Sequence, residues 1–259
     1  MKAVDDLGMR YEGDHPRRVI SLVPSLTHTI ASVDPSLLVG ATQWCSEPST
    51  LNIERIGGTK NPHCERIIAM APDVVIANKE ENRAEDIAVL RNAGIPVWVT
   101  DIDSVEGALG SLRTLITDLL GADLPSWWQG AYDSWHEEPR LPDIRVVVPI
   151  WKKPWMWVGS STFAHDVLER CGLINCLQQI GSRYPRVDLA QAMECEPDLV
   201  ILPDEPYRFT MDDIRQDFPA IAHAFIPGRF LSWYGPDMEI SRLVIEDAIM
   251  RVLPAGRWE

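Results

Sequence analysis

Short apolar runs of strand length alternate with amphipathic stretches of helical length along the first hundred residues. The pattern predicts helices over 25–33, 63–70 and 82–93, and strands over 18–23, 38–42, 73–77 and 96–100. Gly94 after a helix and Pro96 at the start of a strand are typical boundary signals. Strands that alternate with helices in this way favour a parallel sheet.

From residue 103 to residue 136 the pattern is helical only. Asp103 offers an N-cap and Glu106 an acidic residue in the first turn, and both favour a helix start. A second helix is expected from Pro125 to His136. Beyond Pro142 the alternation returns, with a strand from 145 to 148. We then predict helices over 162–171, 188–195, 211–216 and 239–252, and strands over 198–202 and 229–233.

Two segments of the chain resemble each other. Pro72-Asp73 before an apolar run recurs as Pro197-Asp198, 125 residues later, and Arg18-Val19 recurs as Arg145-Val146, 127 residues later. A shared spacing indicates a repeated structural unit, although Pro-Asp before a strand is also common by chance. The fold class predicted is therefore α/β, with two Rossmann-like lobes containing parallel sheets, a helical linker and an inter-lobe ligand cleft. The expected bounds are 1–102, 103–142 for the linker, and 143–259.

Composition narrows the class of protein. The 259 residues suffice for a core without disulfides or metal, and 46% hydrophobic with 24% charged residues is typical of globular proteins. Acidic residues outnumber basic ones by 38 to 24, for a net charge of −14. That charge disfavours nucleic acids and anionic membranes as partners. No run of 18 apolar residues exists, so we predict no membrane span.

The five cysteines bear on the compartment. Cys45, Cys64, Cys171, Cys176 and Cys195 are odd in number and form no Cys-x-x-Cys pair, which favours reduced thiols. The first residues show no basic segment followed by an apolar run. We therefore expect a cytoplasmic location, or a periplasmic or extracellular one if a signal segment was removed.

Aromatic residues gather where the predicted strands end. Ligands of open parallel sheets bind beyond the carboxyl ends of the strands, and a rigid apolar wall with few polar groups suits a large flat ligand. For each ring the alternative is core packing, which we expect for Trp98, Trp127, Trp128 and Trp135. The ligand-binding residues predicted on this ground are Trp44, Trp155, Trp157, Trp233 and Tyr234.

Signatures of catalysis and metal binding are missing. The six histidines form no His-x-His or His-Glu-x-x-His pattern, and the side chains of the consecutive His63, Cys64 and Glu65 cannot all face one ion. There is no Gly-x-Ser-x-Gly elbow and no P-loop, although residue types alone leave a Ser-His-Asp set open. We predict no catalytic residues, no metal site and no intrinsic cofactor.

The chain resembles the class III, helical-backbone (TroA-like) solute-binding proteins, most closely the cobalamin-binding type of bacterial vitamin B12 uptake, from about residue 4 to 252. The resemblance implies two α/β lobes bridged by a rigid helix, a cleft between them, no catalysis, and a chelated-metal ligand such as a corrinoid, haem or siderophore. The motifs that carry it are Asp5-Asp6-Leu7-Gly8, Pro16-x-Arg18-Val19, Ser21-Leu22-Val23-Pro24-Ser25-Leu26-Thr27, Val39-Gly40, Glu65-Arg66-Ile67, Pro72-Asp73-Val74-Val75-Ile76 and Phe163-x-x-Asp166-Val167-Leu168-Glu169-x-Cys171-Gly172.

Individual positions follow from this resemblance. Tyr184 falls on a ligand-contact position, as do Trp44, the loop from Trp155 to Trp157, and Trp233. Other positions depart from the corrinoid binders, which often carry Trp where this chain has Asn61 to His63 and Asn78.

The resemblance also concerns a membrane transporter. Exported members dock on it through one Glu in each lobe. Glu65 matches the first, but the second aligns with the uncharged Ala190, and His28 replaces an acidic residue common after the Pro-Ser-Leu-Thr stretch. We therefore expect transporter docking to be impaired.

Together these observations predict a monomeric, non-catalytic binding protein for a corrinoid-like or other metal-chelate ligand, such as cobalamin, in an aromatic inter-lobe cleft. Two alternatives stay open. One is an exported substrate-binding protein of an ABC transporter. The other is a chelatase-like tetrapyrrole enzyme, which would need an acid–base group such as His28 in the cleft.

Overall fold

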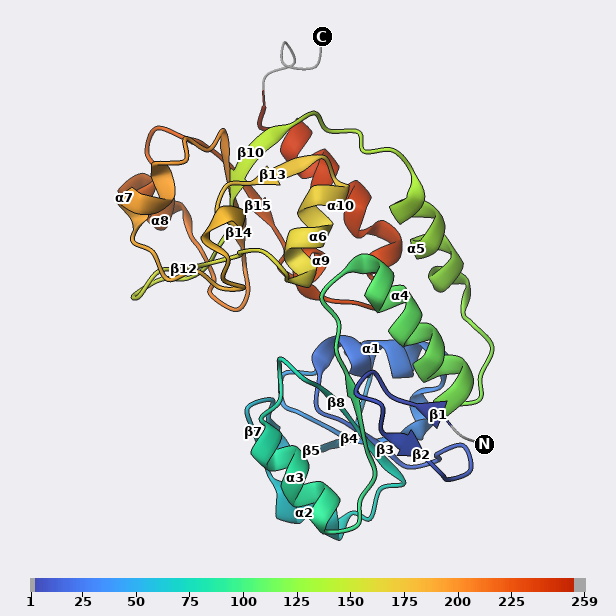
Figure 1. The fold of residues 1–259 in the computed structure, drawn as a ribbon. Helices are drawn as coiled ribbons and strands as arrows, with labels where there is room; N and C mark the ends of the chain where they lie inside the picture. The colour runs from blue at the N-terminus through green and yellow to red at the C-terminus, as the bar shows by residue number, and fades with distance from the viewer. Residues whose placement is uncertain (1–2, 254–259) are drawn as a thin grey trace. The chain divides into compact units, whose positions relative to one another are not determined.

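The computed structural model describes residues 3–253, and the chain divides into two compact units (Figure 1). Each unit contains one parallel sheet with helices against it, which confirms the predicted α/β class with two parallel sheets. Unit 1 comprises Met1–Ile102, Glu106–Gln129 and Tyr234–Pro236, and unit 2 comprises Asp103–Val105, Gly130–Trp233 and Asp237–Glu259. Among residues 3–253, none of the helices is both long and apolar enough to cross a bilayer.

Unit 1 is built on a five-stranded parallel sheet of order β5-β4-β3-β8-β9. Its strands are β3 (Val19–Ser21), β4 (Leu38–Ala41), β5 (Glu54–Arg55), β8 (Val74–Asn78) and β9 (Val97–Thr100). All of β8 is buried, as expected for a parallel strand covered on both faces. The helices are α1 (Pro24–Val33), α2 (Cys64–Ala69) and α3 (Ala84–Asn92), with a 3-10 turn at Pro35–Leu37. In Figure 1, α2 and α3 lie side by side, and their Ile67 and Leu90 enter the core.

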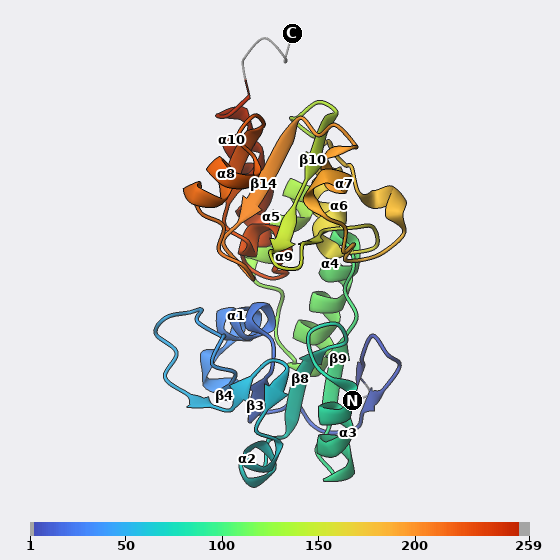
Figure 2. The ribbon, with the colours of Figure 1, turned by 90° about the vertical axis from the view of Figure 1, so that its left-hand side faces the viewer.

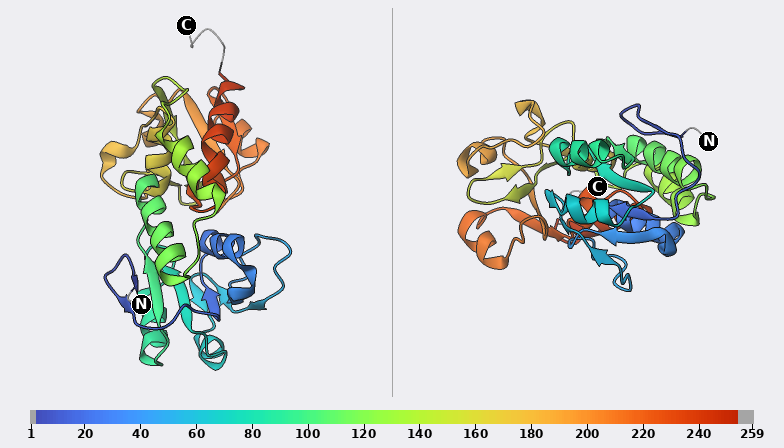
Figure 3. Two further views of the ribbon diagram at one scale, coloured as in Figure 1. Left: turned by 90° about the vertical axis from the view of Figure 1, so that its right-hand side faces the viewer. Right: turned by 90° about the horizontal axis from the view of Figure 1, so that it is seen from below.

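The amino-terminal hairpin of unit 1 covers the free edge of β9. A hairpin of β1 (Ala3–Val4) and β2 (Arg10–Tyr11) lies beside α4 (Figure 3). Asp5 accepts the N–H of Val99 at 2.9 Å, and Asp6 accepts the Ser111 hydroxyl at 2.6 Å. Both carboxylates thereby tie the hairpin to the edge of the sheet and to the helix. Further elements are the ribbon β6 (Gly57–Gly58) with β7 (Asn61–Pro62), α4 (Val105–Thr114), a π-helical turn (Leu115–Leu119) and α5 (Ser126–His136), which continues into unit 2.

Unit 2 has a four-stranded parallel sheet of order β13-β10-β14-β15, and Figure 2 shows β10 and β14 between α6 and α7 on one side and α8 and α10 on the other. Its strands are β10 (Ile144–Val147), β13 (Leu173–Asn175), β14 (Leu199–Pro203) and β15 (Ala222–Ile226), with a hairpin of β11 (Pro149–Trp151) and β12 (Met156–Trp157). Its helices are α6 (Phe163–Arg170), α7 (Leu189–Met193), α8 (Met211–Asp217), α9 (Arg229–Ser232) and α10 (Met238–Met250), with a 3-10 turn at Gln178–Ile180. Capping side chains determine where two of these helices begin. Asp188 at the start of α7 and Thr210 at the start of α8 each form a capping box with the residue three positions on.

The sequence repeat corresponds to one local structure made twice. In unit 1 the Asp73 carboxylate accepts the N–H of Arg18 at 2.8 Å, and the Arg18 guanidinium donates to the Met70 carbonyl at 2.7 Å. In unit 2 Asp198 accepts the N–H of Arg145 at 3.0 Å, and Arg145 donates to the Cys195 carbonyl. Each Arg–Asp pair fastens the start of one central strand to the start of its neighbour, β3 to β8 and β10 to β14.

Two sequence expectations for unit 2 differ from the structure. The strand predicted over 229–233 is wrong, because Arg229–Ser232 forms α9 and the strand is β15, Ala222–Ile226. An apolar run as short as Phe230-Leu231 fits a strand or a buried helical turn equally well, so the pattern could not decide. The short strand β13 was not predicted at all. That residues 103–142 act as a rigid linker, with the bounds given above, stays a prediction.

Candidate functional site

The hairpin β11–β12 follows the carboxyl end of β10 and carries two of the predicted aromatic positions, Trp155 and Trp157. Trp157 has no exposed surface, and its indole N–H donates to the Val187 carbonyl at 3.0 Å. Trp155 is half-buried and stacks on Trp157, with ring centroids 5.2 Å apart, and lies parallel to Phe209 at 6.2 Å. Trp157 therefore anchors the hairpin in the core and supports Trp155, rather than offering a face to solvent.

Two rings outside the predicted ligand-contact set also lie here, the exposed Trp151 and the half-buried Tyr207. Trp151 is 43% exposed and meets Tyr207 edge to face at 5.8 Å. Trp151 follows β10 and Tyr207 follows β14, and these strands are neighbours, so their carboxyl ends meet at one edge of the sheet. The signal available in the sequence is position: Trp151 follows the apolar run that forms β10, and Tyr207 follows the one that forms β14.

A buried ion-pair cluster fastens this hairpin to α8. The Lys152 ammonium lies 2.7 Å from the Asp213 carboxylate and 2.6 Å from that of Asp217, and its side chain is only 9% exposed. Burial alone would lower the pKa of Lys152, but the hydrogen bonds with the two carboxylates outweigh it and raise the pKa. For Asp213 burial opposes ionisation, and the bonds from Lys152 and Thr210 outweigh it, so its pKa is lowered. Lys152 and Asp213 are therefore both ionised at neutral pH, and this pair fixes the position of the hairpin.

Two further predicted residues of unit 2 are half-buried. Tyr184 precedes Pro185, whose carbonyl accepts the backbone N–H of Trp157 at 3.1 Å. Trp233 ends α9 and hydrogen-bonds with the Glu205 carboxylate. Burial and the nearby Asp204 raise the pKa of Glu205, and the bond with Trp233 partly offsets this rise. Both residues thus have surface left for a ligand, and the Trp233 ring is also held by Glu205.

In unit 1 the corresponding feature is a single ring, Trp44, in the loop after β4. It is 63% exposed, the most exposed of the large hydrophobic side chains in residues 3–253. Its loop is rigid, because Arg55 donates to the carbonyl of Cys45 at 2.8 Å and to that of Thr42 at 3.1 Å. The indole nitrogen lies 3.5 Å from where a Cβ at Gly58 would be, an ordinary contact distance, so the ring packs beside the β6–β7 ribbon. A single exposed ring is common on protein surfaces, so it is the place of Trp44 after the carboxyl end of β4 that makes it a candidate contact.

Tyr234 and Asn78 serve the structure of unit 1. Tyr234 is 4% exposed, and its hydroxyl donates to Glu81 at 3.2 Å; burial raises its pKa well above the usual value. The Asn78 side chain donates to Thr100 and accepts the N–H groups of Glu80 and Glu81. As placed here, neither side chain offers surface to a ligand.

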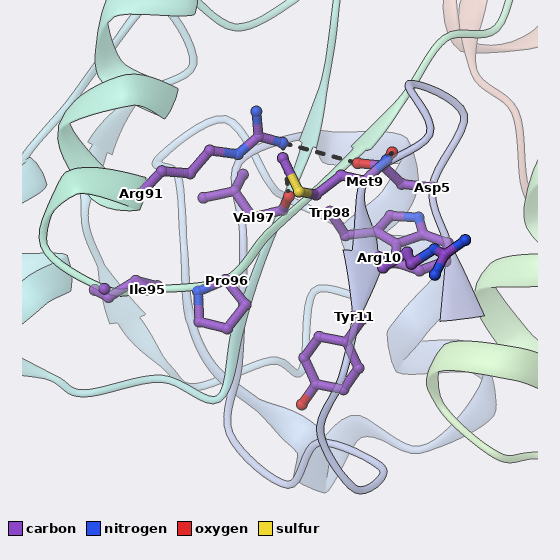
Figure 4. A pocket seen from close by; sticks show the side chains of 10 residues that line it. Asp5, Met9, Arg10, Tyr11, Arg91, Ile95, Pro96, Val97 and Trp98 are labelled. Atoms are coloured by element: carbon purple, nitrogen blue, oxygen red, sulfur yellow. Dashed lines mark hydrogen bonds and ion pairs between the residues drawn. The ribbon is translucent and has the colours of Figure 1, made fainter. Parts of the chain in front are cut away.

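A cavity of about 330 Å³ in unit 1 lies away from these rings (Figure 4). Its wall comprises the β1–β2 hairpin, Arg91 and the amino end of β9, whereas ligands of parallel sheets bind at the carboxyl ends. Figure 4 shows Arg91 directed at Asp5 and the Val97 carbonyl, so its charge is used within the protein. The indole nitrogen of Trp98 has no partner but is itself buried, out of reach of a ligand. We assign no function to this cavity.

Glu65, the predicted docking residue, is exposed in the first turn of α2. Its neighbours His63 and Cys64 do not form a metal cluster with it. Within residues 3–253 no three His, Cys, Asp or Glu side chains gather closely enough to hold a metal ion.

Comparisons with known proteins agree with the resemblance inferred from sequence. No protein-family model matches the chain. It is 25% identical over 202 residues to a vitamin B12-binding protein of Pectobacterium carotovorum, covering 74% of this chain and 72% of that one. Its structure is similar to the periplasmic vitamin B12-binding protein BtuF of Vibrio cholerae, with a TM-score of 0.71, 17% identity, and 92% and 98% of the two chains covered.

A second solved structure is the periplasmic haem-binding protein RhuT from Roseiflexus sp. RS-1, with a TM-score of 0.70, 18% identity, and 90% and 98% of the chains covered. At these identities the solved structures establish the fold, and the resemblance to class III solute-binding proteins is confirmed. The names of all three similar proteins describe binding proteins and not enzymes.

The expectation of a cytoplasmic location is wrong. Both solved structures that resemble this chain are of periplasmic proteins. The cysteine argument is weak because burial can protect an unpaired thiol in any compartment: Cys45 and Cys171 have no exposed surface, whereas the other three cysteines are half-buried. A buried thiol survives in an oxidising compartment, so an odd cysteine count is a weak guide to location.

Proposed function

We propose that this chain, which has the fold of the helical-backbone solute-binding proteins, is a periplasmic, non-catalytic binding protein for a corrinoid-like or other metal-chelate ligand. The observation that carries the proposal is the exposure of aromatic rings beyond the carboxyl ends of strands in both units. Trp44 follows β4, and Trp151 with Tyr207 follows β10 and β14. Rings in these places suit the flat face of a macrocycle.

Each predicted ligand residue has a specific place in this proposal. Trp44, Trp155, Tyr184 and Trp233 keep the ligand-contact role, because each has surface available. Trp157 and Tyr234 are fully packed, and we propose that they support the neighbouring contact residues instead. Trp151 and Tyr207 are added to the contact set.

Within the ligand class, we propose that a corrinoid binds more tightly than haem. The chain carries a net charge of −14, and haem brings two carboxylates to that surface, whereas the corrinoid rim carries uncharged amides. Long-range repulsion of an anionic ligand lowers its association rate and affinity. The similar proteins include a B12 binder and a haem binder, which supports the class but does not order its members.

The test is a titration of cobalamin, cobinamide, haem and a ferric siderophore, followed by quenching of tryptophan fluorescence. We expect one of the corrinoids to quench the fluorescence saturably. The affinity of the protein for that corrinoid should fall in Trp151→Ala. Tyr132→Ala is the matched control, since Tyr132 is 38% exposed on α5, away from the strand ends. Failure of all four ligands to bind, or equal losses in both variants, would contradict the proposal.

For the membrane partner, impaired docking stays our prediction. Ala190 is exposed in α7, and Glu194 is exposed one turn on, with its N–H bonded to the Ala190 carbonyl at 3.1 Å. Glu194 is thus the acidic group best placed to substitute for the missing Glu. Uptake in cells that lack their own B12-binding protein should be weak with the natural chain and restored by Ala190→Glu. Full uptake with the natural chain, lost in Glu194→Ala, would assign the docking role to Glu194.

A further inference from the structure

Cys176 and Cys195 are distant in sequence but lie together in unit 2. Cys176 directly follows β13, and its N–H donates to the Val146 carbonyl of β10 at 2.9 Å. Cys195 follows α7, and its carbonyl accepts from Arg145, the residue of β10 before Val146. Both side chains pack against the same core cluster. Neighbouring residues of one strand therefore hold the two cysteines in place.

The Cys195 side chain lies within hydrogen-bonding reach of the Cys176 thiol. The Cys195 S–H itself donates to the Ala192 carbonyl at 2.9 Å. Both side chains are half-buried, so neither thiol is sealed in the core. Two partly accessible cysteines held side by side in this way are candidates for a disulfide.

We propose that Cys176 and Cys195 form an intramolecular disulfide in the mature protein. The oxidant is an external disulfide of the glutathione type. The Cys195 thiolate attacks one of its sulfur atoms and releases one thiolate; the Cys176 thiolate then attacks the Cys195 sulfur and releases the second. The two cysteines lose two protons and two electrons, and the external disulfide becomes two thiols. The periplasmic location of similar proteins supplies a compartment in which such a bond persists.

The bond would close the segment 176–195, which holds the aromatic hairpin. Within it, Pro185 accepts the backbone N–H of Trp157, and Val187 accepts the indole N–H. Tyr184 lies in the same segment. A covalent closure of about 20 residues restricts the unfolded chain and should raise the melting temperature by ~5–10 °C.

The electrostatics of Cys176 predict how the closure rate depends on pH. Burial, the largest cause, together with the contact with Cys195 and the nearby Asp198 raises the pKa of this thiol to about 12, although Arg145 opposes the rise. Thiolate is then scarce at neutral pH. As long as the pH is below that pKa, the thiolate fraction increases about tenfold for each unit by which the pH rises. The second step of closure should therefore accelerate from pH 7 to pH 9.

The experiment exposes the folded, reduced protein to oxidised glutathione and counts thiols in denaturant. We expect the five thiols to fall to three, and a tryptic digest to link the peptides 171–183 and 187–208. The link should vanish in Cys176→Ser and in Cys195→Ser. It should persist in Cys171→Ser, which removes the other cysteine of the first peptide, and in the matched control Cys64→Ser, a half-buried thiol of unit 1.

Melting of the oxidised and reduced forms completes the test. The ~5–10 °C difference should be abolished by dithiothreitol and absent in both serine variants. Five thiols after oxidation, glutathione adducts without a cross-link, or a bond to another cysteine would each overturn the proposal. Should a serine variant fail to fold, the thiol count and peptide link of the unmodified chain, with Cys171→Ser, still decide.

Discussion

The two units have sheets of corresponding strand order, but they differ in the segment that follows the first central strand. The order β4-β3-β8-β9 in unit 1 corresponds to β13-β10-β14-β15 in unit 2, and in both an Arg–Asp pair fastens the two central strands. In unit 1, β3 ends at Ser21 and α1 begins at Pro24. In unit 2 the hairpin β11–β12 stands between β10 and α6. The Arg–Asp pair, which both units contain, joins the central strands of each sheet. The hairpin β11–β12, which only unit 2 contains, carries the tryptophan rings.

The sharpest way to break this comparison is to remove the anchor of the hairpin. Trp157→Ala deletes a ring with no exposed surface that packs in the core, and we expect a loss of ~3–5 kcal/mol in the free energy of unfolding of unit 2. Urea unfolding measures it, with Trp151→Ala as the control that should cost far less, since Trp151 is 43% exposed. Equal costs would mean that the hairpin is not anchored through Trp157.

A second comparison uses one ion pair from each unit. Lys152→Met leaves two carboxylates without their cation among side chains that are 9–12% exposed, and we expect a loss of ~3 kcal/mol in stability. Lys79→Met removes the cation of an exposed pair with Asp101 in unit 1, for which we expect at most ~1 kcal/mol. Thermal unfolding of both variants checks the difference; a larger effect of Lys79→Met would contradict it.

Ligand affinity tests whether both units contribute rings. Trp44→Ala, Trp151→Ala and Trp233→Ala should each weaken the best ligand by ~1–3 kcal/mol, as expected for the loss of a stacking surface, with little change in stability for the first two. Isothermal titration measures the affinity. If only the unit 2 variants lose affinity, Trp44 is not a contact and the ring in unit 1 has another role.

The smallest effect expected is a dependence on pH. The pKa of Asp213 is lowered in the folded protein, so its ionised form contributes stability above the unfolded pKa of about 3.9, and this is lost as pH falls through the folded value. The stability difference between the natural chain and Asp213→Asn should therefore shrink as the pH falls below about 4. Urea unfolding at several acidic pH values checks this; a difference independent of pH would exclude the ionised carboxylate as its source.

Sequence reasoning reached the repeated features more readily than the unrepeated ones. Arg18 with Asp73 and Arg145 with Asp198 recur at one spacing, so the two sheets were predictable. The hairpin has no counterpart in unit 1, and its exposed and buried rings are all tryptophan. Trp151 and Trp157 differ only in tertiary environment: one meets Tyr207 at the edge, and the other donates to Val187 inside. Composition cannot separate them, because burial is decided by segments distant in sequence.

Unit 1 is completed by residues from near the carboxyl end of the chain. Tyr234–Pro236 belong to unit 1, and at Gly235, with a φ of 142°, a Cβ would lie 2.4 Å from the Thr29 hydroxyl. The first unit thus waits for a segment that emerges after nearly all of the second. A nascent chain stalled before residue 234 would expose the slot that Tyr234 fills beside Glu81. Folding of the amino-terminal unit is therefore complete only once nearly all of the chain is available.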